Sequence, residues 1–244
     1  MFPSVVASEL EQIAADLLNQ PERAPLSAAV VVDEAQDLVL ASFSLLRALV
    51  GAARATEETR AWATAVLHGV DFDDLDGGCD SASDYRSLLH GDAPLVQGFE
   101  DPADEQRFLV TTLRQLRDEQ QSLASTCVTA RTNRAVEKRK GLLKAEGCAT
   151  RVINADESDD PSDPALRLAT MHRVKGLEFD QVFLPALDAS QMPLRIELNK
   201  RPDQLSKDLF EQLERSLLHV AASRAKKRVV VSFRGKPSPF LRPA

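Results

Sequence analysis

The sequence predicts an α/β fold in which helices cover both faces of a mostly parallel sheet. Short apolar runs alternate with longer segments whose apolar residues recur every three or four positions. Strands joined through helices of this length run parallel, because an antiparallel pair needs only a short turn between its strands. The 43% hydrophobic content of the 244 residues is enough to bury such a sheet on both faces.

The first part of the chain is predicted to hold one strand among helices. Three segments have apolar residues at helical spacing, whereas "AAVVV" is an uninterrupted apolar run typical of a buried strand. Residues 69–92 are rich in Gly, Asp and Ser and indicate a domain boundary or a long loop. The elements expected before that segment are helices at 4–19, 38–50 and 55–68 and a strand at 28–32.

In the second part, strands and helices alternate regularly, which favours a single parallel sheet. Residues 154–164 interrupt the alternation as a polar, acidic loop. The expected helices are 103–120, 133–146 and 206–225, and the expected strands are 94–99, 125–130, 149–154, 165–171, 181–187 and 227–233.

Charge and composition exclude several classes of protein. The net charge of −7 argues against a generally basic surface for nucleic acid, although a local cationic track remains compatible with it. Three widely spaced cysteines without a C-x-x-C pair predict neither a disulfide framework nor a zinc site. No apolar run approaches the length of a membrane span, and the first residues do not resemble a signal peptide, so we expect a cytoplasmic protein without a membrane partner.

The predicted strand at 28–32 runs directly into carboxylates in "AAVVVDEAQD". In phosphoryl-transfer folds, a strand carries an acidic pair to the edge of the sheet, where one carboxylate holds Mg²⁺ and its neighbour orients the attacking water. Asp33 suits the first role and Glu34 the second. An ordinary solvated acidic turn explains this stretch equally well when it is taken alone.

A second stretch, "LATMHRVKGLEFDQVFLPAL", joins two predicted strands. Thr170 and His172 lie at the end of the first strand, and Glu178 precedes the second. Lys175 could neutralise a phosphate, and Gly176 predicts a tight turn that lets the backbone approach a ligand closely. The alternative is a plain surface connection with an exposed histidine and lysine.

A third stretch, residues 209–233, has cations near the end of the last predicted helix. The helix dipole alone explains Lys226 and Lys227 if they occupy its last turn. Arg224 could instead be aimed from this helix at a phosphate held by another domain, as an arginine finger.

Together, in this order and at these spacings, the three stretches resemble the UvrD/Rep-type (superfamily 1) DNA helicases, motors with ATP between two RecA-like domains. "VVVDEAQD" resembles their Walker B segment, "TMHRVKGLEFDQVFLP" their fifth motif and "ERSLLHVAASRAKKRVVV" their sixth. "CVTARTNRAVE" is similar to the segment that opens the second RecA-like domain, and "RATEETRAWA" to a motif that begins with a phosphate-contacting arginine. The resemblance implies a P-loop NTPase-class fold, with 1–68 a remnant of the first domain and 69–244 a nearly complete second domain.

The resemblance also implies roles for individual residues. It implies that ATP and Mg²⁺ are the cofactors and that single-stranded DNA is a partner. The implied catalytic residues are Glu34, which activates water, and Arg224, the arginine finger. The implied metal ligand is Asp33. The implied nucleotide contacts are Gln36, Arg54, Lys175, Gly176 and Glu178. The implied DNA contacts are Arg131, Thr170 and His172.

The sequence lacks a Walker A loop, G-x-x-x-x-G-K-[ST], which supplies most contacts to a triphosphate. Its only Gly-Lys pair, Gly235–Lys236, is followed by a proline. We therefore expect a truncated, helicase-like fragment that cannot hydrolyse ATP or unwind DNA alone, which leaves its status as an enzyme open. One alternative is a piece of a split helicase completed by a partner that carries the P-loop. Another is a non-catalytic interaction module in DNA repair.

Overall fold

The computed structural model describes residues 55–67, 87, 89–120, 122–154, 160 and 162–241. Contacts divide the chain into Met1–Arg54 and Ala55–Ala244, and only the second unit holds described residues. The elements expected at 4–19, 28–32 and 38–50 therefore lie outside the described residues. Within the described part, no helix is both long and apolar enough to span a membrane.

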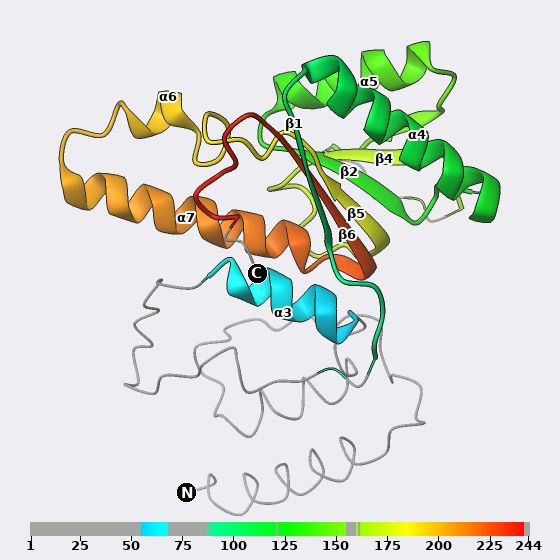
Figure 1. Ribbon diagram of the computed structural model, residues 1–244, viewed down its shortest axis with the longest axis horizontal. Helices are drawn as coiled ribbons and strands as arrows, with labels where there is room; N and C mark the ends of the chain where they lie inside the picture. The colour runs from blue at the N-terminus through cyan, green and yellow to red at the C-terminus, as the bar shows by residue number, and fades with distance from the viewer. Residues whose placement is uncertain are drawn as a thin grey trace, which may run out of the picture. The chain divides into compact units, whose positions relative to one another are not determined.

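The described part of the second unit contains a parallel six-stranded sheet, which confirms the predicted fold class (Figure 1). The strands follow the order β1-β6-β5-β2-β4-β3, and every neighbouring pair runs parallel. All six predicted strands are present. Their bounds are β1 Leu95–Phe99, β2 Thr126–Ala130, β3 Thr150–Val152, β4 Leu166–Thr170, β5 Phe179–Leu184 and β6 Ala225–Arg234.

Helices cover both faces of this sheet, as in a RecA-like fold (Figure 1). Helices α4 and α5 contribute to the core on one face, and α3 and α7 contribute to the core on the other. The short helix α6 was not predicted, because four residues are too few to show a helical period. The helices described are α3 Glu57–Ala65, α4 Pro102–Gln120, α5 Asn133–Ala145, α6 Arg195–Leu198 and α7 Gln204–Ala222.

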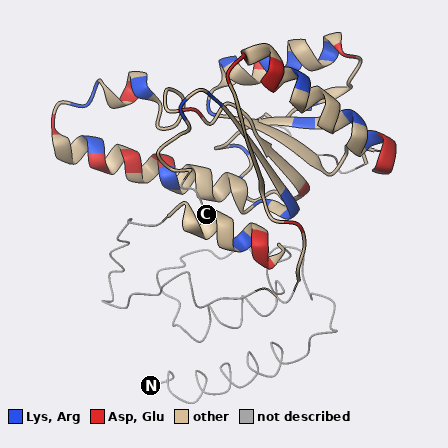
Figure 2. Ribbon diagram, viewed as in Figure 1, with Lys and Arg blue, Asp and Glu red and all other residues tan. Residues whose placement is uncertain are grey.

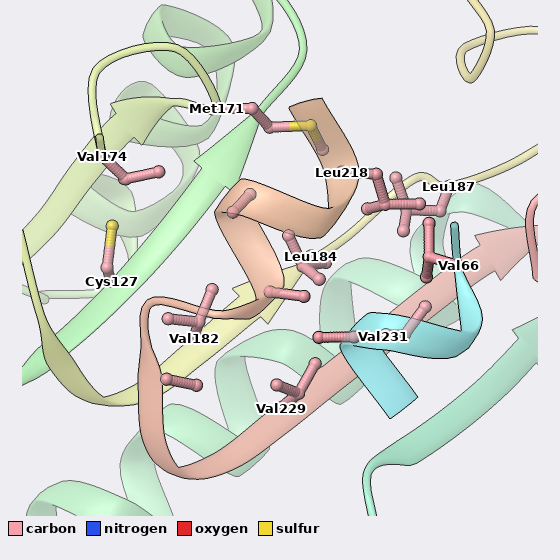
Figure 3. Packing of buried hydrophobic residues seen from close by; sticks show 14 of the residues in the cluster. Val66, Cys127, Met171, Val174, Val182, Leu184, Leu187, Leu218, Val229 and Val231 are labelled. Carbon is pink, nitrogen blue, oxygen red and sulfur yellow. The ribbon is translucent and has the colours of Figure 1, made fainter. Parts of the chain in front are cut away.

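Consecutive residues of the central strands supply the two cores alternately. In β6, Val229 and Val231 pack on the α3 and α7 side, whereas Val230 packs on the α4 and α5 side. Figure 3 shows the first of these cores, to which Leu218 of α7 and Val66, which follows α3, belong together with strand residues such as Leu184 and Val231. Burial on both faces explains why the strands appear in the sequence as continuous apolar runs.

Local signals set the beginnings of the helices. The side chain of Thr132 accepts a hydrogen bond from the N–H of Ala135 at the start of α5, at 3.2 Å. Asp203 accepts one from the N–H of Ser206 at the start of α7, at 2.8 Å. Such caps satisfy donors that have no partner inside the helix. The predicted starts of both helices are therefore close to the observed ones.

Helix α3 packs on α7 and β6, although the boundary predicted from the sequence lies after it. Thr56, the N-cap residue of α3, donates its N–H to the carbonyl of Lys226 at 2.8 Å. Near its other end, the Nδ1 atom of His219 lies 2.9 Å from the carbonyl oxygen of Ala63, and Arg215 donates to that of Val66 at 3.1 Å. These contacts occupy carbonyls that the end of a helix leaves unpaired.

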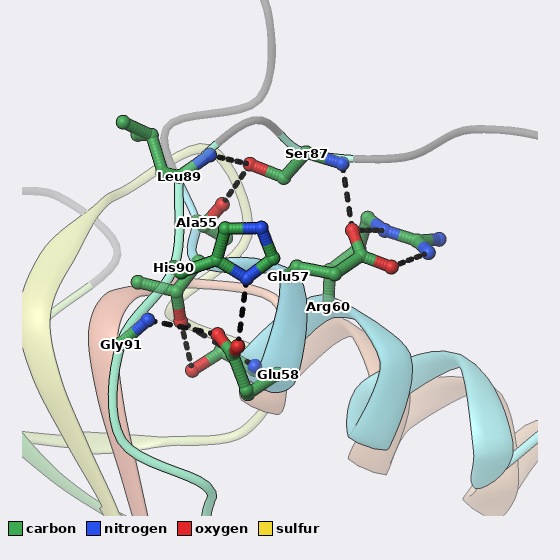
Figure 4. A network of polar contacts seen from close by, with 10 residues as sticks. Ala55, Glu57, Glu58, Arg60, Ser87, Leu89, His90 and Gly91 are labelled. Carbon is green, nitrogen blue, oxygen red and sulfur yellow. Dashed lines mark hydrogen bonds and ion pairs between the residues drawn. The ribbon is translucent and has the colours of Figure 1, made fainter.

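A polar network ties the start of α3 to the segment before β1 (Figure 4). The N–H of Ser87 donates to Glu57 at 2.6 Å, and the Ser87 hydroxyl donates to the carbonyl of Ala55 at 2.7 Å. Glu58 accepts the N–H of Gly91 at 2.9 Å, and His90 lies at the same distance from its other oxygen. The chain therefore returns to α3 before it enters the sheet.

Leu218→Ala is expected to lower the free energy of unfolding by about 2–5 kcal/mol, because it removes a fully buried side chain from the core between α7 and the sheet. Leu213→Ala on the same helix is the matched control, since that side chain is 68% exposed. Urea unfolding followed by circular dichroism measures both variants. A Leu213→Ala loss as large as that of Leu218→Ala would contradict this packing.

Candidate functional site

The described candidate residues lie at two opposite edges of the sheet. Because all strands run parallel, their carboxyl ends share one edge and their amino ends share the other. Thr170 ends β4, and Arg131 directly follows β2, at the carboxyl edge. Glu178 and Arg224 directly precede β5 and β6, at the amino edge. Four predicted residues lie outside the described residues: Asp33, Glu34, Gln36 and Arg54.

At the carboxyl edge, a pocket of about 180 Å³ opens between β3, β4 and the start of α5. Its wall includes Asn133, Asn154, Thr170, Arg173 and the carboxylate-bearing Glu137. Thr170 is 8% exposed, and its hydroxyl makes no hydrogen bond with the described part of the chain. The pocket thus has an unused hydroxyl in its wall and a cationic side chain beside it.

The first turn of α5 adds backbone donors to this pocket. The side chain of Thr132 accepts the N–H of Ala135, and the N–H groups of Asn133 and Arg134 belong to the first turn, where a helix has no internal acceptor for them. The helix dipole places partial positive charge at the same point. An anion such as a phosphate therefore meets backbone donors, a hydroxyl and a guanidinium here.

His172 lies next to this pocket, one residue before Arg173. Burial lowers the pKa of His172 below its usual 6.5, and the positive charge of Arg131 lowers it further, while Glu214 opposes the shift. The imidazole is therefore neutral at neutral pH. It can donate or accept a hydrogen bond there, but it adds no positive charge.

The guanidinium of Arg131 is already engaged by a carboxylate. Its Nε atom donates to both oxygens of Glu214 on α7, at 2.9 and 3.0 Å, and Nη2 donates to the same group. The side chains of Arg131 and Glu214 are 16% and 3% exposed. Glu214 also accepts the N–H of Leu194 at 3.1 Å. This pair was not predicted, because no local sequence pattern links residues so far apart.

At the amino edge, backbone pairing brings Glu178 and Arg224 together. The N–H of Phe179 donates to the carbonyl of Arg224 at 2.9 Å, and Phe179 pairs with Ala225 in the sheet. Burial lowers the pKa of Arg224, and the nearby Glu178 carboxylate partly offsets that shift. The guanidinium of Arg224 donates hydrogen bonds to the end of α7. It lies 3.3 Å from the carbonyl oxygen of Val220 and 3.3 Å from the hydroxyl of Ser223.

The connection between β4 and β5 crosses the sheet from one edge to the other. Met171 and Val174 anchor it in the core on the α3 and α7 side. Gly176 has a φ of +83°, which confirms the predicted tight turn, because residues with a side chain rarely adopt that conformation. The neighbouring Lys175 is exposed. A β-carbon added at Gly176 would meet no atom within 4 Å, so the turn is open to a ligand.

The explanation of Lys226 and Lys227 by the helix dipole was wrong, although the predicted strand at 227–233 already included Lys227. Helix α7 ends at Ala222, and both lysines belong to β6, because pairing with β5 begins at Ala225. Their ammonium groups lie 3.2 and 2.8 Å from the carboxylate of Asp180. Ion pairs, and not the helix dipole, therefore account for these two cations.

The described residues do not complete a nucleotide or metal site by themselves. Among them, no group of three His, Cys, Asp or Glu side chains could hold a metal ion. The amino edge presents Arg224, Lys175 and the open turn at Gly176, which suit one side of a polyphosphate. Lys and Arg alternate with Asp and Glu along the described helices (Figure 2).

Comparisons with known proteins agree with this architecture. Residues 150–236 match the model of the UvrD-like helicase C-terminal domain. Among solved structures, the chain is similar to the C-terminal domain of a possible DNA helicase from Lactobacillus plantarum WCFS1, with a TM-score of 0.53 and 19% identity over 77% of this chain and 90% of that one. That likeness shows the fold.

A second similarity, to the C-terminal part of the Fun30 ATPase domain, covers 96% of this chain and 82% of that one. Its TM-score of 0.34 at 8% identity is too low to support an argument. No curated protein sequence matches the chain.

Asp180→Asn is expected to lower the free energy of unfolding at neutral pH. The variant is also expected to lose less of its free energy of unfolding than the wild type when the pH is lowered. Burial raises the pKa of Asp180, but hydrogen bonds from Lys227 and Lys226 outweigh burial and hold the pKa below its usual 3.8. The stabilisation is therefore present above the usual pKa and is lost as the pH falls through the lowered one.

Urea unfolding at neutral pH and at about pH 3 tests this linkage. Asp118→Asn, which alters a carboxylate on α4 that is 69% exposed, is the control and is expected to change stability little. Equal acid sensitivity of the wild type and Asp180→Asn would show that the ion pairs do not contribute.

Proposed function

We propose that the chain binds single-stranded DNA and serves the nucleotide chemistry of a helicase motor, a proposal supported by the match of residues 150–236 to the UvrD-like helicase C-terminal domain. Backbone phosphates of the DNA bind at the carboxyl edge of the sheet. Arg224 at the amino edge faces a nucleotide held mainly by other residues. A role in DNA repair and a cytoplasmic location rest on the family resemblance alone.

The observation that carries the DNA-binding proposal is the pocket beside Thr170. Its hydroxyl lacks a hydrogen-bond partner in the described structure, and the start of α5 and Arg173 offer donors to the same space. A phosphate diester uses such donors without reading the base. Glu137 also lines the pocket and opposes an anion, so the contact is expected to be weak and to depend on salt.

His172 and Thr170 keep their proposed DNA-facing roles at this edge. A neutral imidazole can donate a hydrogen bond to a phosphate or sugar oxygen, or stack on a base. The overall charge of −7 argues against a broad attraction for nucleic acid, and the cations at the pocket and at the start of α5 are Arg173 and Arg134. We therefore propose a short backbone-binding track and not an enclosing channel.

At the amino edge, Arg224 is proposed to stabilise charge on the transferring phosphoryl group. ATP, when bound, supplies the phosphoanhydride bond, and Mg²⁺ neutralises part of its charge. Among the residues of this chain, Glu178 orients Arg224 and accepts a hydrogen bond from the ribose, while Lys175 and the turn at Gly176 approach the phosphates. Asp33 and Glu34 are proposed to hold the metal ion and the water, and Gln36 and Arg54 to contact the γ-phosphate.

A second candidate is a split motor. The 244 residues contain no G-x-x-x-x-G-K-[ST], although they include an arginine at the position of an arginine finger. In phosphoryl transfer, positioning and charge stabilisation supply nearly all of the catalysis. We therefore propose that hydrolysis requires a P-loop from a separate helicase subunit, which presents its bound triphosphate to Arg224.

Arg173→Gln is expected to weaken binding of labelled single-stranded DNA equally for all sequences. Loss of one phosphate contact reduces the slope of log K against log salt by about 0.7 for a single strand. Arg117→Gln in the last turn of α4 removes the same charge away from the pocket and is expected to leave the slope unchanged. Fluorescence anisotropy across a salt series measures both. Equal slopes for the wild type and Arg173→Gln would contradict the pocket assignment.

The purified chain is expected to release no phosphate from ATP above background, with or without single-stranded DNA. In a mixture with a P-loop partner, turnover is expected to appear, and Arg224→Ala to reduce kcat by about 10³–10⁵-fold, as for other arginine fingers. A colorimetric phosphate assay measures both. Turnover by the chain alone that disappears in Glu34→Gln would refute the dependence on a partner.

A further inference from the structure

Glu214 is a buried carboxylate in the middle of α7 with two hydrogen-bonding partners, Arg131 and Leu194. It binds the guanidinium of Arg131 through both oxygens, at 2.9 and 3.0 Å from Nε, and it accepts the N–H of Leu194 at 3.1 Å. Its side chain is 3% exposed. A carboxylate so far removed from water is stable only while its partners stay in place.

Arg131 occupies a position from which a phosphate contact would be expected. It follows the last residue of β2 and precedes Thr132, the cap of α5, whose first turn borders the pocket. The guanidinium is nevertheless directed to α7, and its side chain is 16% exposed. A phosphate would have to replace a doubly hydrogen-bonded, desolvated carboxylate, which is a poor exchange because Glu214 would remain buried and unpaired.

We propose that Glu214 is a positioning residue that withholds Arg131 from nucleic acid. The pair stays closed when DNA binds, and the phosphate is held by Arg173, Thr170 and the start of α5. In the closed state, Glu214 also joins α7 and the segment at Leu194 to the turn that caps α5. This inference rests on the proposed DNA-binding function and alters its residue assignment, because Arg131 becomes part of the frame of the site.

The charges around the pair are consistent with this assignment. Across the same edge, His172 and Arg173 face the pair from the end of β4, and the pKa of His172 responds to both Arg131 and Glu214. With Arg131 neutralised by Glu214, the local positive charge comes from Arg173 and Arg134. Because Arg131 does not contact DNA, the carboxyl edge neutralises one phosphate fewer than it would with a free Arg131.

The test compares Glu214→Gln, Arg131→Gln and the double variant Arg131→Gln/Glu214→Gln in single-stranded DNA binding across a salt series. Glu214→Gln frees the guanidinium, so the magnitude of the salt slope is expected to rise by about 0.7, with tighter binding at low salt. The double variant is expected to return to the wild-type slope. Glu211→Gln makes the same charge change one helical turn away and is expected to leave the slope unaltered.

Two results would overturn the proposal. The first is a double variant whose slope falls by about 0.7, since Arg131 would then contact phosphate in the wild type. The second is a Glu214→Gln variant that behaves like Glu211→Gln. Circular dichroism and thermal unfolding test whether each variant is folded. If Arg131→Gln unfolds, the double variant still allows the comparison, because it leaves no buried charge unpaired.

A readout without DNA separates this proposal from the proposed function. By NMR titration, the pKa of His172 is expected to fall in Glu214→Gln and to rise in Arg131→Gln, because each variant removes one of two opposing charges. If the wild type shows no salt-dependent DNA binding and Arg173→Gln changes nothing, the DNA-binding function fails. An unchanged His172 pKa in both variants would refute the pairing of Arg131 with Glu214.

Discussion

All six strands of the described sheet run in the same direction, and this constraint determines where each functional side chain can lie. A residue that follows a strand lies at one edge, and a residue that precedes a strand lies at the other. Thr170 and Glu178 are only eight positions apart, yet they occupy opposite edges. The segment between them can cross the sheet because Met171 and Val174 are buried along its path. One short motif therefore serves two separate surfaces.

Burial of charge gives the edges their definite geometry. At the carboxyl edge, Glu105 accepts the N–H of Ala186 at 2.8 Å and the hydroxyl of Ser232 at 2.7 Å. Ala186 has a φ of 60°, a conformation that residues with a side chain seldom adopt, and the Glu105 contact helps to hold it. Glu214 plays a comparable part on the other side of the sheet. Buried carboxylates thus shape loops that apolar packing alone would leave variable.

The strands and long helices could be predicted because their signals are local. Apolar runs identified the strands, and helical apolar spacing predicted helix starts at 133 and 206, close to the observed starts at Asn133 and Gln204. The turn at Gly176 was predictable for the same reason, since its residue type and its φ are linked. The predicted end of the last helix, at residue 225, lies beyond the observed end at Ala222, because a helical apolar pattern does not reveal where pairing with a distant strand begins.

Contacts between distant residues mark the limit of prediction from one sequence. Nothing near Arg131 indicates that Glu214 will bind it, and nothing near Asp180 indicates two lysine partners from β6. The pocket at Thr170 likewise depends on three elements meeting at one edge. The resemblance to a family suggested which residues are important, whereas only the fold shows which of their side chains are already occupied.

The pairing of β1 with β6 has a consequence for how the chain is made. Leu95 pairs with Val230, and Phe99 pairs with Arg234. Strand β1 can therefore complete its backbone pairing only after β6 has been synthesised. Helix α3 likewise packs against α7 and β6. During synthesis on the ribosome, β1 emerges long before its neighbour and is exposed as an unpaired apolar strand.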